Sequence, residues 1–280
     1  MLGIVLAFGS AVSWGFADFL GGIQTRRNAV LAVLLVSQGA GLVGVALLVI
    51  LSGEPPPSLA DMAPAALGGL GGIIALGAFY RALAMGTMSI VAPISATGAV
   101  VPVIAGLAAG DRPGPVQVVG IAVAVTGVIL ASREAPTEDG RKLADTRKSI
   151  ALALIAALGF GGFLTALDHS AQHGVEWALL AARATSFPAV FIAALITRPA
   201  LPGRADLPAL CLVGVLDAGA NGLFAAATTH GLLSIVGVLG SLYPVTTVVL
   251  ARALLRERVR RVQEIGVVAA LAGVALIAAG

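Results

Sequence analysis

Long apolar segments alternate with short polar stretches along almost the whole chain. A membrane-spanning helix needs roughly 20 apolar residues, and Gly, Pro and charged residues mark where such segments end. By this criterion the chain holds ten candidate spans joined by mostly short connections. We predict these spans at residues 2–22, 30–51, 63–83, 88–109, 116–132, 149–167, 175–197, 207–230, 233–255 and 262–279. The expected fold class is an all-α integral membrane protein.

The composition supports this class. Of the 280 residues, 58% are hydrophobic and only 11% are charged, whereas soluble domains carry about 25% charged residues. A soluble core of this size could not hide so much apolar surface, so lipid must be the solvent. The unbroken apolar runs differ from the alternating segments of about 10 residues in an outer-membrane barrel. The net charge of +3 comes from basic residues in loops, so nucleic-acid binding is not expected.

One stretch of the chain occurs twice. Each copy opens on Gly-x-x-Ser-Ile-Val and closes on Gln-x-x-Gly-x6-Gly, with an acid–Arg pair between them. Gly86 recurs as Gly231, 145 residues later, and after one inserted residue the offset becomes 146. The pair Asp111-Arg112 recurs as Glu257-Arg258 at the second offset. We infer an internal duplication.

The duplication divides the chain into a five-helix repeat at residues 1–132, a polar loop at 133–148 and a second five-helix repeat at 149–280. Because five is an odd number, the two copies must cross the membrane in opposite directions. Inverted repeats of this kind are the plan of secondary transporters, which bind substrate near the midplane between the halves. We therefore predict a transporter that works by alternating access through a central cavity.

The charge of the loops gives an orientation. Loops after even-numbered segments contain one basic residue, Arg112, while the other loops contain many. The positive-inside rule then places both termini outside the cell. The N-terminal apolar run is too long for a signal peptide, and we expect a retained first helix. The expected location is the inner or plasma membrane, as a multi-pass protein.

Local motifs indicate a family. They are Trp14-Gly15-Phe16 in the first helix, Ala82-Leu83 in the third, Ser89 to Pro93 opening the fourth, the pair Glu257-Arg258, and Ser241-Leu242-Tyr243-Pro244 in the ninth. Together with the Gln-x-x-Gly-x6-Gly segments, they resemble the EamA-type branch of the drug/metabolite transporter superfamily over nearly the whole chain. The second copy departs from the pattern at Val238, where the first copy has its proline.

This resemblance implies ten helices and export of amino acids or other small metabolites. Among family members, the bacterial inner-membrane exporters of aromatic amino acids are similar in style. The resemblance also implies termini in the cytoplasm, against the charge bias of the loops, and the sequence leaves that orientation open.

Ionisable side chains inside apolar helices are costly in lipid, so each is a candidate for function. Asp217 lies mid-segment, with Asn221 one turn later on the same face. A cavity-facing carboxylate there would bind a substrate ammonium group or a proton; a buried Asp that serves packing is the alternative. Asp18 is a candidate gate or proton site, or an interfacial acid. Arg183 is a candidate for pairing with an acid or binding a substrate carboxylate.

Aromatic residues are scarce, at 5%. In the family that the chain resembles, the helices that carry them line the cavity, where they would stack on a substrate. Core packing is the alternative for each, and Trp14 and Tyr243 stand out because their polar tips need a partner. The candidates are Trp14, Phe79, Tyr80, Phe160, Phe163, Phe224 and Tyr243.

Gly and Pro interrupt corresponding segments of the two repeats. Paired interruptions point to moving, site-lining helices in transporters, although Gly and Pro also serve close packing in membrane helices. The candidate hinge residues are Pro93, Gly98, Pro102, Gly237, Gly240 and Pro244.

The predicted function is secondary transport, with export of aromatic or other neutral amino acids or related metabolites first. Proton-coupled efflux of lipophilic cations is a second hypothesis; the small multidrug transporters use an acid in the first helix, although Asp18 sits later in its helix. An intramembrane enzyme acting on lipid-linked substrates is a third, but the sequence shows no clustered catalytic set.

No metal-ligand spacing and no Walker A motif occur, so no metal, cofactor or ATP is expected. The expected partners are a small-molecule substrate and the lipid bilayer, and two fused halves favour a monomer. The exact substrate and the coupling ion stay open at this stage.

Overall fold

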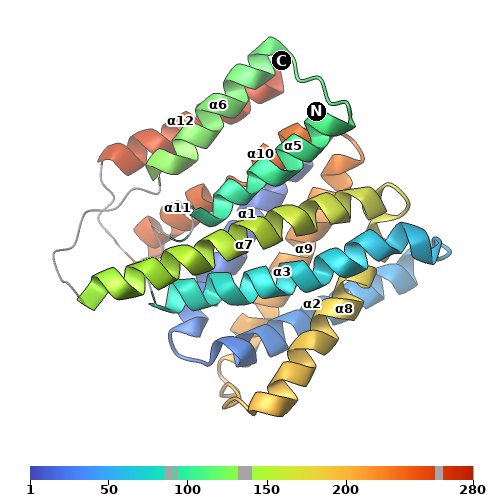
Figure 1. Ribbon diagram of the computed structural model, residues 1–280, viewed down its shortest axis with the longest axis vertical. Coiled ribbons are helices and arrows are strands. Elements are labelled where there is room, and N and C mark those ends of the chain that lie inside the picture. The colour runs from blue at the N-terminus through green and yellow to red at the C-terminus, as the bar shows by residue number, and fades with distance from the viewer. Residues whose placement is uncertain (86–90, 92–93, 132–140, 256–260, 280) are drawn as a thin grey trace.

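The computed structural model describes residues 1–85, 91, 94–131, 141–255 and 261–279 (Figure 1). Throughout these residues the regular structure is helical, as predicted. The elements are α1 (Leu2–Thr25), α2 (Val30–Ser52), α3 (Leu59–Met85), the 3₁₀ turn η1 (Thr97–Ala99), α5 (Val100–Ala109), α6 (Pro115–Ala131), α7 (Arg141–Ala171), α8 (Val175–Thr197), α9 (Leu207–Thr228), α10 (Leu233–Gly240), α11 (Tyr243–Leu255) and α12 (Arg261–Ala279).

Six of the ten predicted spans are long, apolar helices. Within the described residues, α1, α2, α3, α8, α9 and the Lys148–Ala171 part of α7 are long and apolar enough to cross a membrane. The other four segments contain shorter apolar helices, at Ile94–Ala109, Pro115–Gly127, Leu233–Thr247 and Glu264–Ile277. The chain is therefore a multi-pass membrane protein, and the count of ten spans stays a prediction.

The predicted span at 233–255, in which Gly and Pro residues were expected to interrupt the helix, consists of two helices. The segment is broken between α10 and α11, where the Leu242 N–H donates to the Leu239 carbonyl, 3.2 Å away, in a tight 3₁₀ turn. Pro244 follows at the start of α11 and has no N–H to donate to Gly240, so the α-helical ladder cannot continue through the turn. The 3₁₀ turn η1 stands at the equivalent place in the first repeat, before α5. Its first residue, Thr97, lies 145 residues before Leu242.

Helix packing follows the duplication. In Figure 1, α3 runs beside α7 and α6 beside α12. The contact between α3 and α7 has its counterpart between α9 and α1, and that between α3 and α8 has its counterpart between α9 and α2. The pairs α2–α8, α5–α10 and α6–α12 each join a helix to its own repeat partner. Exchanging the halves thus maps these contacts onto one another.

Glycines at matched positions allow these close contacts. A Cβ atom on Gly69 of α3 would overlap the carbonyl oxygen of Ala182 in α8. A Cβ on Gly214 of α9 would overlap the carbonyl oxygen of Ser37 in α2 in the same way. Gly214 and Ala182 lie 145 residues after Gly69 and Ser37, so the two interfaces are copies of each other. Small residues that let backbones approach are the usual means of helix association in lipid.

Candidate functional site

A cavity lies between the two repeats and is lined by residues of α1, α2, α3, the segment 95–99 that contains η1, and α7 to α11. The centre of a water-sized sphere can move through about 90 Å³ of it. A space of this size holds several water molecules when polar groups line it. Eleven of the predicted site residues line it: Trp14, Asp18, Gly98, Phe160, Phe163, Arg183, Asp217, Asn221, Gly237, Gly240 and Tyr243.

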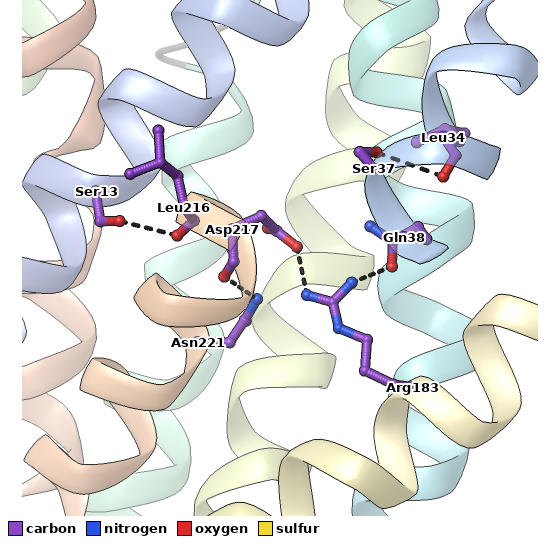
Figure 2. Close-up of polar contacts among 8 residues, drawn as sticks. All are labelled: Ser13, Leu34, Ser37, Gln38, Arg183, Leu216, Asp217 and Asn221. Carbon is purple, nitrogen blue, oxygen red and sulfur yellow. Dashed lines mark hydrogen bonds and ion pairs between the residues drawn. The ribbon is translucent and has the colours of Figure 1, made fainter. Parts of the chain in front are cut away.

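The strongest polar feature of the cavity is a charged pair. Arg183 of α8 is 6% exposed, and its Nη2 lies 2.5 Å from the Asp217 carboxylate of α9 (Figure 2). Its Nη1 donates to the Gln38 side-chain oxygen of α2. A buried charge is tolerated only when it is paired and hydrogen-bonded. Asp217, a candidate for binding a substrate ammonium group or a proton, is paired with a protein cation in this structure.

Hydrogen bonds from α1 hold the Asp217 turn in place. The Ser13 and Ser10 hydroxyls donate to the carbonyl oxygens of Leu216 and Ala220, each over 2.8 Å (Figure 2 shows the Ser13 bond). Asn221 donates from Nδ2 to the Asp217 carbonyl oxygen at 2.7 Å. These bonds fix the charged pair to the contact between α1 and α9.

Two buried polar atoms in the cavity wall have no hydrogen-bond partner among the described residues. They are the Asn221 side-chain oxygen and the Ser95 hydroxyl, on residues that are 5% and 2% exposed. A buried polar group left without a partner costs about 1–3 kcal/mol. The Asn221 oxygen is an acceptor, so it would take a hydrogen bond from a ligand N–H or O–H group.

Asp18 is the third charged residue of the cavity lining. Within the described part of the chain it has no hydrogen-bond or ion-pair partner, although it is close enough to Asp217 for the two charges to interact. With Arg183, the two acids give the described lining a formal charge of −1. The sequence suggested an interfacial position as one option for Asp18, and the structure places it at the cavity instead.

Aromatic rings form two layers on the cavity wall. Trp14, Phe160 and Tyr243 line the cavity. Behind them, Phe224 lies 5.8 Å from the Trp14 ring centroid, and Phe79 lies 5.8 Å from Phe160 and 6.3 Å from Tyr243. Phe79, Phe224 and Tyr80 are buried and do not reach the cavity, so in this conformation these three predicted residues support the wall rather than form it.

The predicted hinge residues lie on the interrupted helices. Gly98, Gly237 and Gly240 line the cavity, while Pro102 and Pro244 are buried beside it. A Cβ atom on Gly237 would come within 3.0 Å of the Pro102 ring, so the interrupted helices of the two repeats touch each other there. Pro93 lies outside the described residues.

Sequence reasoning missed four polar residues of the lining, namely Gln38, Ser95, Ser186 and Ser241. Gln38 carried a usable signal, because an amide in the middle of an apolar helix needs a partner. The three serines carried little, since small hydroxyl residues are common in membrane helices.

Two repeated halves of membrane-spanning helices enclose a cavity in which Asp18, Arg183 and Asp217 lie among mostly apolar residues, an arrangement that occurs in membrane transporters. The sequence agrees with this class: the model of the EamA-like transporter family matches residues 1–133 and again 147–279. The chain belongs to the EamA-like transporter family, as its motifs predicted. Membership implies a membrane transporter of small substrates and a non-enzymatic role. The likeness to exporters of aromatic amino acids stays a prediction.

Solved structures share the fold. Twenty-eight solved chains match this one. One of them, described as "Crystal structure of protein", superposes with a TM-score of 0.78 over 98% of this chain and 95% of its own, at 14% sequence identity. No functionally curated protein is similar enough in sequence to match.

Proposed function

We propose that the protein is a secondary transporter that exports amino acids with aromatic or other apolar side chains, or related small metabolites, across the inner or plasma membrane. The observation that carries this proposal is the combination of charges and aromatic rings in one cavity between the repeats. A neutral amino acid has both charges and an apolar body.

The cavity offers a partner to each part of such a substrate. Asp18 and the free Asn221 oxygen accept hydrogen bonds, as an ammonium group requires. Arg183 uses two of its five N–H groups on Gln38 and Asp217, which leaves others for a carboxylate. Trp14, Phe160 and Tyr243 supply apolar and aromatic surface.

Alternating access would expose this cavity to each side of the membrane in turn. The interrupted segments α10–α11 and η1–α5 supply the flexible points, and they meet across the repeats at Gly237 and Pro102. Both repeats are present in one chain, so we expect a monomer to complete the cycle.

Counterflow in proteoliposomes tests the proposal. Vesicles loaded with unlabelled phenylalanine, threonine or methionine receive the labelled compound outside, and we expect accumulation above protein-free vesicles for at least phenylalanine. Asp217→Asn should abolish the signal because it frees the Arg183 charge in the cavity. Glu54→Gln, on an exposed connection, is the matched control and should transport normally. Absence of counterflow for every amino acid would contradict the proposal.

Efflux of lipophilic cations in exchange for protons is the second candidate. It is favoured by Asp18, an acid without a described partner in a cavity of formal charge −1. Labelled tetraphenylphosphonium would then accumulate in the same assay where amino acids do not, and Asp18→Asn would abolish that accumulation.

A further inference from the structure

Helices α3 and α9, which occupy equivalent places in the two repeats, present chemically different faces to the cavity. Positions 145 residues apart are equivalent in α3 and α9, as the matched contacts of Gly69 and Gly214 show. Asp217 and Asn221 of α9 therefore correspond to Gly72 and Leu76 of α3, and all four line the cavity. The duplicated positions are charged and polar in the second repeat and apolar in the first.

Helix α7 extends this apolar wall. Leu76 on α3 faces the cavity together with Phe160, Phe163 and Leu164 of α7. The wall bears no ionisable side chain in the described lining, while Arg183 and Asp217 lie on the α8–α9 side. A substrate with a charged head and an apolar body has one favourable orientation in such a cavity.

The space beside the apolar wall depends on the absence of a side chain at Gly72. Phe163 is half-buried and packs directly over Gly72: a Cβ atom added to Gly72 would lie 3.0 Å from the Phe163 Cγ and 3.3 Å from its Cδ2. These distances are shorter than ordinary carbon–carbon contacts of 3.5–4.0 Å. With a larger residue at position 72, the Phe163 ring would have to shift, and because this ring lines the cavity, the shift would change the shape of the apolar wall.

We propose that the apolar wall receives the side chain of the substrate, and that Gly72 and Phe163 set the largest side chain that the transporter admits. This inference rests on the proposed function, because it assigns a specificity element within the same cavity. Gly72 acts as a positioning residue, through the ring of Phe163, and Phe163 is the residue that meets the substrate.

Two opposite substitutions test this assignment. Gly72→Ala should shrink the wall and lower counterflow of phenylalanine relative to alanine by about tenfold, the discrimination that one methylene group gives in an apolar pocket. Phe163→Ala should enlarge the space beside the apolar wall and raise counterflow of tryptophan relative to phenylalanine by a similar factor. The adjacent Gly71→Ala is the matched control, because a Cβ there meets nothing within 4 Å, and it should leave both ratios unchanged.

The outcomes separate this inference from the proposed function. Suppose that the unmodified protein exchanges phenylalanine, but that neither Gly72→Ala nor Phe163→Ala changes the ratio of counterflow between large and small amino acids. This result would overturn the size assignment and leave the proposed function intact. If the unmodified protein moves no amino acid, the proposed function fails, and tetraphenylphosphonium and tetramethylammonium become the large and small probes of cavity size. A shift of their ratio toward the smaller cation in Gly72→Ala, but not in Gly71→Ala, would still support the size assignment, and an unchanged ratio would overturn it.

Discussion

Gln38 and Arg183 occupy the same position in the two repeats and are hydrogen-bonded to each other. Each is the ninth residue of a 23-residue helix, α2 beginning at Val30 and α8 at Val175. A contact between equivalent residues can form only at the axis that relates the two halves. The axis therefore passes close to this contact, and one difference between the copies, Gln against Arg, places a positive charge in the cavity lining.

This arrangement makes a prediction about stability. Arg183→Gln leaves the Asp217 carboxylate in the cavity wall without its partner, and we expect a loss of about 3–5 kcal/mol in the free energy of unfolding. The double variant R183Q/D217N removes both charges and should recover most of that loss. Thermal unfolding of the purified protein in detergent measures the cycle. With the single variant Asp217→Asn completing the cycle, a loss in the double variant equal to the sum of the two single losses would show that the pair does not couple.

Much of this site was predictable, because ionisable residues in apolar helices are few. Asp217 and Arg183 were recognised on that ground, and Asn221 because it lies one turn after Asp217; all three line the cavity. Their mutual contacts were not predictable. Asp217 and Arg183 lie on different helices, and no periodicity along a sequence reports which helices face each other.

The aromatic residues show a second limit. Phe160 and Tyr243 line the cavity as expected, whereas Phe79, adjacent to Tyr80 on α3, lies behind them. In a helix that is apolar all round, periodicity cannot separate the face toward a cavity from the face toward protein. The break at Leu242 was only half predicted: the interrupting Gly and Pro residues were identified, but not that the helix ends there.

The glycine contacts between repeats give a packing prediction. Gly127 of α6 and Gly273 of α12 each lie against the backbone of the partner helix, at Ala270 and Ala124. Gly127→Leu should destabilise the protein by about 1–3 kcal/mol through overpacking. Gly44→Leu is the control, because a Cβ there meets nothing within 4 Å. Similar unfolding temperatures for the two variants would contradict the assigned contact between α6 and α12.

A cap joins the first repeat to the interrupted helix of the second. The Asp111 carboxylate accepts a hydrogen bond from the Ser234 N–H at 2.8 Å, at the start of α10. Asp111→Ala should cost about 1 kcal/mol, as for other N-terminal caps. Asp111→Asn keeps an acceptor and should cost less. The unfolding temperatures of the two variants test this capping role. The same unfolding temperature for both would contradict it.

The interrupted helix α10 gives a prediction about rate. A Cβ atom on Gly240 would lie 3.2 Å from the Phe224 ring and 3.4 Å from Trp14, so Gly240→Ala should hinder repacking at the break. We expect slower counterflow, with a change in unfolding temperature of no more than about 4 °C. Gly98 is a poorer test, because a Cβ there would overlap the Ala157 carbonyl oxygen and disturb packing. Normal flux in Gly240→Ala would count against a hinge at this residue.

The central claim is that the substrate binds in the cavity between the repeats, and the protein carries a reporter for it. The chain has two tryptophans; Trp14 lines the cavity, whereas the Trp177 indole donates to the Glu54 carbonyl near the ends of α2 and α8. In the Trp177→Phe variant, fluorescence titration with phenylalanine reports on Trp14 alone. We predict a saturable change in that variant and none in Trp14→Phe. A variant that transports phenylalanine while its Trp14 fluorescence stays constant would contradict the claim.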